Sequence, residues 1–368
     1  MPQNILLISP YHTGSHKAWA AGWQAHSTHN VELLTLKGQF WKWRMQGGAV
    51  TLAQKFMALD FVPDHIVVTD MLDLATFLGL AREKVQGIPI TLYMHENQLN
   101  YPQKTKGWTP AHLTATIQQF AFINYTSMMA ADRIFFNSHY HKTQFFNDLP
   151  VFLNHFPDNQ GVENVANLEA KSAVLPVGIN LNRLDSLEIG KLDREPPLIL
   201  WNQRWEYDKN PKQFFQVLFR IAQEGIPFRV AICGENFQKN PETFLEAQEK
   251  LGERVIHFGY ADSETYKRLL WESAVTLSTA KHEFFGISIL EAIYTHTFPI
   301  LPQRLSYPEL IPAGFHIDII YTDFHDMLAK LRWALAYPNE ARETAKKLAL
   351  SVAKYDWQTL VKSYDKMF

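Results

Sequence analysis

Short stretches that are apolar at almost every position recur along the chain, and each is followed by a segment long enough for a helix. In the first half these stretches are residues 4–9, 31–36, 65–69, 90–94 and 133–137. Near-continuous apolar runs suit strands that are buried on both faces, as in a parallel sheet covered by helices. Residues 47–59 and 110–130 are examples of the helix-length segments between them. This alternation predicts a doubly wound α/β domain.

A second series of the same kind begins after Glu-Pro-Pro at 195–197. Its apolar stretches are residues 198–202, 229–233, 254–258, 275–279 and 298–302. Between the two series lies a polar stretch, 156–172, without clear periodicity, and residues 174–180 have the pattern of a last strand of the first series. We therefore expect two such domains, residues 1–180 and residues 196–352.

The last segment of the chain has the pattern of an amphipathic helix. It is YDWQTLVKSYDKMF, residues 355–368, and its apolar stripe consists of Trp357, Leu360, Val361 and Tyr364. Such a stripe needs an apolar surface to cover it.

Composition limits the classes of protein to consider. A chain of 368 residues exceeds one compact core, and 46% hydrophobic with 13% aromatic residues indicates well-buried globular domains. The net charge of −2 gives no global positive field, so any nucleic-acid contact must be local. A single cysteine, Cys233, excludes an intramolecular disulfide and fits a reducing compartment. No signal peptide and no apolar segment of ~20 residues is present, so we expect a cytoplasmic protein without membrane contact.

Polar residues follow several of the predicted strands, at the edge where such folds bind ligands. After residues 4–9, Gly14 and Ser15 open a helix whose free N–H groups can hold an anion, although the pair can also be only a tight turn. After residues 90–94 comes MHENQLNYP, where His95 is either a functional or a structural histidine.

Two further loops follow strands of the second series. In WNQRWEYDKNP, Arg204 and Lys209 are spaced so that a guanidinium and an ammonium can converge on one diphosphate; otherwise they are solvated surface cations. In HEFFGISILE, a helix beginning near Gly286 directs free N–H groups toward a ligand phosphate. Glu283 and Glu291 can accept hydrogen bonds from ligand hydroxyls, although Glu291 can also simply favour the helix dipole.

Glu283 and Glu291 form the E-x7-E pattern of retaining GT-B glycosyltransferases, and HEFFG resembles the E-x-F-G core of glycosyltransferase family 4. Arg204 and Lys209 match the arginine and lysine that clamp the diphosphate in that family. More narrowly, the chain resembles the tRNA-queuosine α-mannosyltransferases, the glycosyltransferase-like domain-containing group. The matching stretches are residues 40–45, 95–102, 156–160, 201–211, 279–294 and 307–310.

The resemblance implies a GT-B fold, in which two Rossmann-like domains face a central cleft and a C-terminal helix, residues 353–368, crosses back to the N-terminal domain. It implies that the N-terminal domain binds the acceptor, that the C-terminal domain binds GDP-mannose, and that mannose is transferred with retention. The roles that it implies for single residues are these: Glu283 on the transferred sugar, Glu291 on the ribose, amides of Phe285, Gly286 and Ile287 near the sugar and diphosphate, Gly14 and Ser15 on the diphosphate, and His95 beside the anomeric carbon.

Catalysis by these groups consists mainly of stabilising the leaving diphosphate, through Arg204, Lys209 and the helix-end amides. With His95 and Glu283, these two cations make up the expected catalytic set. No D-x-D triplet occurs in the chain, so we expect turnover without a metal or another cofactor.

The acceptor surface is expected where cations alternate with aromatic residues, in FWKWRM and KTKGW. Such an arrangement suits an RNA backbone with splayed bases, although it also suits core tryptophans with solvated cations. The residues concerned are Trp41, Lys42, Trp43, Arg44, Lys104, Lys106 and Trp108, together with Glu96 and Asn97 of the loop after residues 90–94.

The leading hypothesis is transfer of mannose to queuosine in the anticodon loop of tRNA (tRNA-Asp). Alternatives are a family-4 transferase with another nucleotide-sugar and a glycan, lipid or small-molecule acceptor, a GT-B sugar-nucleotide epimerase, or a binding module without turnover. The sequence leaves the donor base, the donor sugar and the oligomeric state open.

Overall fold

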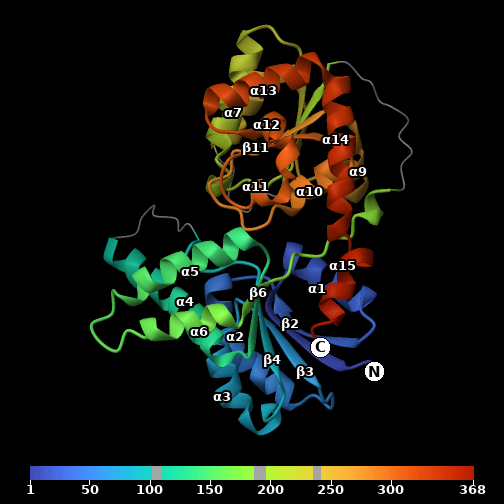
Figure 1. Ribbon diagram of the computed structural model, residues 1–368. Helices are drawn as coiled ribbons and strands as arrows, with labels where there is room; N and C mark the ends of the chain where they lie inside the picture. The colour runs from blue at the N-terminus through green and yellow to red at the C-terminus, as the bar shows by residue number, and fades with distance from the viewer. Residues whose placement is uncertain (102–109, 186–195, 235–241) are drawn as a thin grey trace. The chain divides into compact units, whose positions relative to one another are not determined.

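The computed structural model describes residues 1–101, 110–185, 196–234 and 242–368, and the side chains of 110–117 lie outside this description. The chain divides into two compact units (Figure 1). Unit 1 comprises Met1–Ile179 and Trp357–Phe368, and unit 2 comprises Asn180–Asp356. Each unit contains a six-stranded sheet whose strands are all parallel. This is the α/β class predicted from the sequence. Among the described residues, no helix is long and apolar enough to cross a membrane.

The sheet of unit 1 has the strand order β2-β1-β3-β4-β5-β6. Its strands are β1 (Asn4–His12), β2 (Asn30–Lys37), β3 (His65–Thr69), β4 (Ile90–Met94), β5 (Arg133–Phe136) and β6 (Ser172–Val174). Its helices are α1 (Gly14–His26), α2 (Trp41–Met57), α3 (Leu74–Val85), α4 (Pro110–Ala130), α5 (His139–Leu153), α6 (Val165–Ala170) and α15 (Trp357–Asp365). The first five predicted strands are confirmed.

Two local predictions in unit 1 are wrong. The last strand is Ser172–Val174 and not residues 174–180, because Pro176 has no N–H to continue the ladder with β5. Helix α2 begins at Trp41, six residues before the predicted start, so FWKWRM lies mostly on a helix. The polar stretch 156–172 contains the short helix α6, which shows no clear period in the sequence.

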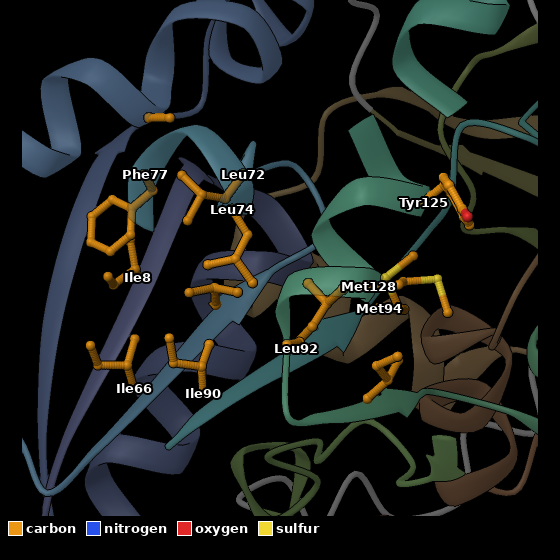
Figure 2. Packing of buried hydrophobic residues seen from close by; sticks show 14 of the residues in the cluster. Ile8, Ile66, Leu72, Leu74, Phe77, Ile90, Leu92, Met94, Tyr125 and Met128 are labelled. Atoms are coloured by element: carbon orange, nitrogen blue, oxygen red, sulfur yellow. The ribbon is translucent and has the colours of Figure 1, made fainter. Parts of the chain in front are cut away.

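One face of this sheet forms the main core of unit 1 with α2 to α6. Ile8 of β1, Ile66 of β3 and Leu92 of β4 pack against Phe77 of α3 and Met128 of α4 (Figure 2). Burying a side chain of this size contributes roughly 1.5–3 kcal/mol relative to leaving it in water. Alternation along each strand directs the neighbouring side chains, such as Ile5 and Leu7, to the other face.

The C-terminal helix α15 packs against α1 in unit 1 (Figure 1). All four side chains of the predicted stripe are buried. A Cβ atom at Gly22 or at Gly178 would lie 2.0 Å or 2.4 Å from the indole of Trp357, so both positions need glycine. Deeper in the unit, the Tyr364 hydroxyl accepts a hydrogen bond from the Trp19 indole at 2.8 Å and lies 3.2 Å from the Tyr93 hydroxyl of β4. The end of the chain is thus fixed to the strand that precedes His95.

The sheet of unit 2 has the order β12-β11-β10-β7-β8-β9. Its strands are β7 (Leu198–Trp201), β8 (Arg229–Cys233), β9 (Val255–Gly259), β10 (Val275–Leu277), β11 (Phe298–Pro302) and β12 (Ile320–Tyr321). Its helices are α7 (Pro211–Gln223), α8 (Glu242–Leu251), α9 (Ser263–Glu272), α10 (Ile287–Tyr294), α11 (Tyr307–Leu310), α12 (His316–Ile319), α13 (Phe324–Ala336) and α14 (Pro338–Val352). The five predicted strands are confirmed. The two-residue strand β12 was not predicted because it is too short to show a pattern.

Replacing Trp357 by Ala should destabilise unit 1 by about 3–5 kcal/mol, because it empties the space between Gly22 and Gly178. The free energy of unfolding in urea measures this change. Trp43→Ala serves as the matched control, since Trp43 is 61% exposed and its removal leaves no buried cavity. Equal effects of the two substitutions would contradict the packing described for α15.

Candidate functional site

In unit 2, two loops at the carboxyl ends of neighbouring strands are joined by hydrogen bonds. The loop after β7 carries Arg204 and Lys209, and the loop after β10 carries Glu283. The N–H of Lys281 donates to the Asp208 carbonyl at 2.7 Å, and the Thr279 hydroxyl donates to the Lys209 carbonyl at 3.0 Å. Residues about seventy positions apart in the sequence are thereby held side by side.

The ammonium of Lys209 lies at the centre of this arrangement. The residue as a whole is only 6% exposed. Its Nζ donates to the His282 carbonyl at 2.8 Å and to Glu283 Oε2 at 3.2 Å, and it lies 3.4 Å from Asp208 Oδ2. Buried cations need such partners, because an unpaired buried charge is strongly destabilising. The structure therefore brings together two of the predicted catalytic residues, Lys209 and Glu283.

Glu283 is held in its ionised form. Burial alone would raise the pKa of this carboxyl group, but the Lys209 ammonium and a hydrogen bond from the Phe285 N–H at 3.3 Å lower the pKa below its ordinary value. Burial, and next the charge of Lys209, lower the pKa of the neighbouring His282 to about 4, so this imidazole is neutral at neutral pH. The loop thus presents one carboxylate whose charge and direction are fixed.

Helix α10 begins directly after the Phe-Phe-Gly turn, as predicted. Gly286 has a φ of 109°, a conformation that favours glycine, and a Cβ there would lie 3.2 Å from Leu310 Cδ1. No side chain caps the helix at Gly286, and the Ser306 hydroxyl fixes the turn by donating to the Phe285 carbonyl at 2.9 Å. Uncapped N–H groups at the start of Ile287–Tyr294 are suited to a phosphate group.

Glu291 lies on α10, is 7% exposed, and is part of a polar cluster. Its Oε2 accepts a hydrogen bond from the Tyr266 hydroxyl at 2.8 Å, and its Oε1 is ion-paired with Arg183. Asn202, at the end of β7, donates to the Ser288 carbonyl at 2.7 Å and lies 3.3 Å from the Tyr266 hydroxyl. Sequence reasoning missed Arg183 and Tyr266, since each is an isolated residue without a spacing that marks it.

Arg204 lies in the same loop as Lys209, but its side chain is half exposed. Its guanidinium is 3.6 Å from Glu206 Oε1. Glu206 itself is partly buried; burial raises its pKa, and the charge of Arg204 lowers it. The guanidinium of Arg204 is thus exposed to solvent, whereas the ammonium of Lys209 is buried.

In unit 1, the predicted residues gather at the carboxyl ends of β1 and β4. Gly14 is the first residue of α1, with a φ of 49°, and it and Ser15 are exposed without a side-chain cap at Thr13. His95 follows β4, and its ring centroid lies 4.4 Å from that of His16 and 4.5 Å from that of Trp19. His95 therefore lies against the helix that begins with the predicted pair, Gly14 and Ser15.

Hydrogen bonds to its main chain fix the position of His95. Its N–H donates to Asp70 Oδ1 at 2.9 Å, and its carbonyl accepts from the Asn137 amide at 2.8 Å. Its buried Nε2 has no hydrogen-bond partner among the described residues. Burial, and then His16 and His141, hold the pKa of His95 well below its ordinary range, so the ring is neutral at neutral pH.

Asp70 at the end of β3 is a further residue that sequence reasoning missed. Burial, and next the Glu96 carboxylate, raise its pKa. Glu96 Oε1 accepts from the Gln98 amide at 3.0 Å. Asn97 is fully buried, and its Oδ1 accepts from the Asn100 N–H at 2.8 Å, which closes a turn. The loop after β4 is therefore held by its own polar side chains.

The stretch FWKWRM divides into buried and exposed parts. Trp41 is half-buried, with its ring centroid 5.3 Å from that of Phe120, and the Lys42 ammonium lies over the Trp41 ring at 5.6 Å. Trp43 is exposed, and Arg44 Nε donates to the Lys37 carbonyl at 3.1 Å. The remaining predicted acceptor residues, Lys104, Lys106 and Trp108, lie outside the described residues.

Comparison with known proteins agrees with this two-part architecture. Residues 4–179 match the family described as tRNA-queuosine alpha-mannosyltransferase N-terminal, and residues 183–349 match the family described as glycosyl transferases group 1. The chain is 33% identical over 317 residues to a tRNA-queuosine alpha-mannosyltransferase of Drosophila melanogaster, which covers 84% of this chain and 82% of the fly protein. The chain belongs to the tRNA-queuosine alpha-mannosyltransferase family. It is a glycosyltransferase.

Solved structures show that this member of the tRNA-queuosine alpha-mannosyltransferase family has the GT-B fold. Sucrose-phosphate synthase from Thermosynechococcus elongatus matches with a TM-score of 0.72 at 14% identity, covering 99% of this chain and 98% of that one. Anabaena Alr3699/HepE in complex with UDP and glucose matches with a TM-score of 0.68 at 13% identity, covering 99% of both chains. At such low identity these likenesses concern the fold alone. The resemblance to the tRNA-queuosine alpha-mannosyltransferases, and the GT-B fold that it implies, are therefore confirmed.

The part of the chain that the structure describes contains no group of three or more His, Cys, Asp or Glu side chains placed to hold a metal ion. The polar groups of the unit 2 site include the carboxylates of Glu283 and Glu291, the buried ammonium of Lys209, the exposed guanidinium of Arg204 and the uncapped amides of α10. This set suits an anionic ligand that also carries several hydroxyl groups.

Replacing Lys209 by Met should raise the pKa of Glu283 above its ordinary value of 4.5, because burial then acts without the compensating ammonium. In the native protein the lowered pKa makes Glu283 stabilising above the pKa of the unfolded chain, and this stability is lost as pH falls through the folded pKa. In the variant the sign reverses, and the carboxylate opposes folding at neutral pH. Carboxyl ¹³C NMR titration measures the pKa, and Lys281→Met, at an exposed neighbour, is the control. An unchanged Glu283 pKa in Lys209→Met would contradict the ion pair.

Proposed function

We propose that this glycosyltransferase moves mannose from GDP-mannose to queuosine in the anticodon loop of tRNA (tRNA-Asp), with retention at the anomeric carbon. The observation that carries the proposal is the 33% identity, over most of both chains, to the fly protein named tRNA-queuosine alpha-mannosyltransferase. The geometry of unit 2 supports the donor half of the proposal, because it combines groups for a diphosphate with groups for sugar hydroxyls.

In the proposed donor complex, Glu283 accepts hydrogen bonds from hydroxyls of the transferred sugar. Lys209 keeps this carboxylate ionised and directed, through the ion pair at 3.2 Å. The amides of Gly286 and Ile287 lie where the Phe-Phe-Gly turn meets α10, and we place the diphosphate there. The Phe285 amide, which donates to Glu283 in the unliganded protein, is proposed to lie near the sugar. As the bond from the anomeric carbon to the diphosphate breaks, Arg204 and the helix amides stabilise the negative charge that develops on the leaving group.

Glu291 is proposed to bind the ribose of the donor. Its carboxylate already accepts a hydrogen bond from a hydroxyl group, that of Tyr266, and ribose hydroxyls have the same donor chemistry. Arg183, on the other oxygen of Glu291, is part of the same cluster. The ribose and the sugar are thus assigned to opposite ends of the Phe-Phe-Gly turn.

His95 is proposed to lie beside the anomeric carbon during transfer. Its lowered pKa is favourable there, because positive charge develops on the sugar in the transition state of glycosyl transfer, and an imidazolium would oppose it. Gly14 and Ser15, at the open start of α1, are proposed to contact the diphosphate. Glu96, with the FWKWRM segment, is proposed to contact the tRNA, while the burial of Asn97 favours an indirect role in shaping the loop.

The transfer reaction is tested by mixing the purified protein, GDP-mannose and queuosine-containing tRNA, and by analysing the digested nucleosides by mass spectrometry. We expect a queuosine species heavier by one hexose. Glu283→Ala should lower the yield by at least about a hundredfold, as expected when one group that stabilises the transition state is removed. Glu264→Ala, at an exposed carboxylate of unit 2, is the control.

Two results would contradict the proposal in different ways. Hexose transfer to another acceptor, without any shift of queuosine, would exclude tRNA. A mass shift that persists in Glu283→Ala would exclude the proposed sugar site.

Turnover is proposed to be independent of a metal, because no D-x-D triplet is present and because Arg204 and the helix amides are proposed to stabilise the charge of the diphosphate. We expect the same initial rate with and without excess EDTA. A rate that falls to the background in EDTA and returns when Mg²⁺ or Mn²⁺ is added would contradict this proposal.

A further inference from the structure

A hollow of about 470 Å³ lies at the edge strand β2 of unit 1, near the carboxyl ends of β1 and β2. Most of the side chains that line it are cationic or can become so, and none is a carboxylate. The lining residues are His12, Lys17, Thr35, Leu36, Lys37, Arg44 and Lys55. They come from β1, α1, β2 and α2, so four consecutive elements contribute to one concave surface.

Close backbone packing forms the hollow. A Cβ at Gly38 would lie 2.2 Å from Thr13 Cγ2, so the loops after β1 and β2 touch at a position that needs glycine. A Cβ at Gly48 would lie 3.2 Å from Pro10 Cβ, so α2 lies tightly against the end of β1. Arg44 Nε donates to the Lys37 carbonyl at 3.1 Å, which ties the start of α2 to the end of β2. These contacts hold together the elements that carry the cations.

The positive charge of the hollow is not balanced by neighbouring acids. In the described part of the chain, none of the four permanent cations of the lining takes part in an ion pair. Burial, and then the charge of Lys17, lower the pKa of His12. Like charges held together without counter-charges raise the local potential and attract an anion. This differs from the donor site, where Lys209 has carboxylate partners.

Exposed aromatic rings lie on or directly before α2, the helix that carries Arg44 and Lys55. Trp43 of α2 is 61% exposed, with its ring against Gly47, and Phe40, directly before α2, is 76% exposed. Rings of this kind stack on unpaired bases, while lysines act as point charges on backbone phosphates without reading sequence. A helix that carries both cations of the hollow and an exposed aromatic ring therefore fits a single-stranded or looped RNA better than a small anion.

We propose that this hollow is a subsite for backbone phosphates of the acceptor RNA, with Lys17, Lys37, Arg44 and Lys55 as the contacting cations. The inference rests on the proposed function, since it takes tRNA as the acceptor. Phosphate contacts fix the register of a nucleic acid on a protein, so the subsite would position the loop that carries the reacting nucleoside.

The test is a double charge reversal, Lys37→Glu with Lys55→Glu. The dissociation constant of queuosine-containing tRNA is measured by fluorescence anisotropy over a series of salt concentrations. We expect binding weakened on the order of tenfold or more, and a salt slope of log Kd smaller by about one for each phosphate that the variant no longer binds. The pair Lys37→Arg with Lys55→Arg should keep both values, and Lys37→Gln with Lys55→Gln should give a smaller effect of the same sign.

The matched control changes the same charge elsewhere in unit 1. Lys362→Glu with Lys366→Glu reverses two exposed lysines at the end of the chain and should leave the tRNA affinity close to that of the native protein. In turnover, the double reversal in the hollow should raise KM for tRNA more than it lowers kcat. Melting temperatures confirm that each variant is folded.

The outcomes separate the inference from the function on which it rests. If the native protein modifies tRNA but the double reversal in the hollow keeps the native affinity and salt slope, the subsite is wrong and the function stands. If the control pair weakens binding equally, the effect belongs to net charge, and the subsite is again wrong. If the native protein neither binds tRNA nor modifies it, the proposed function fails and tRNA is not the occupant of the hollow.

Discussion

Parallel strand direction is the constraint on which both polar centres depend. Because every strand of each sheet runs the same way, all of its carboxyl ends lie at one edge, and the loops that follow neighbouring strands must meet there. In unit 2 this brings Lys209, after β7, against Glu283, after β10. In unit 1 it brings Asp70, after β3, against the main chain of His95, after β4. Polar side chains therefore gather at these two edges, while apolar side chains cover the faces of the sheets.

The charges at these edges are organised in two different ways. Lys209 is buried and neutralised by acidic neighbours, so its main effect in the unliganded protein is to fix the direction and ionisation of Glu283. In the proposed donor complex, the uncapped start of α10 and the exposed Arg204 bind the anionic ligand in unit 2. The hollow beside β2 keeps its cations without acidic partners, as a surface that receives a large polyanion would. A lysine neutralised by carboxylates, such as Lys209, is suited to orienting a small ligand. The cations of the hollow, which have no carboxylate partner among the described residues, are suited to attracting a large polyanion.

The sequence predicted the parts of the structure that depend on local pattern. Ten strands, the start of α10 at the Phe-Phe-Gly turn and the buried stripe of α15 follow from apolar runs, a glycine position and helical spacing. Strand β6 ends before Pro176, and α2 begins after Phe40, which has a φ of 52°. Each of these boundaries depends on a single backbone position, which the pattern of apolar residues does not show. Asp70, Arg183 and Tyr266 could not be predicted, because each acts through a partner distant in the chain and has no motif around it. The roles of the predicted site residues stay predictions.

The turn between Glu283 and Glu291 is proposed to hold the diphosphate of a nucleotide-sugar. A crystal structure of the protein with GDP-mannose tests it most directly. We expect the diphosphate within hydrogen-bonding distance of the first amides of α10, ribose hydroxyls on the Glu291 carboxylate, and mannose hydroxyls on Glu283. A nucleotide bound away from α10, or a ribose that leaves Glu291 paired only with Arg183 and Tyr266, would contradict it.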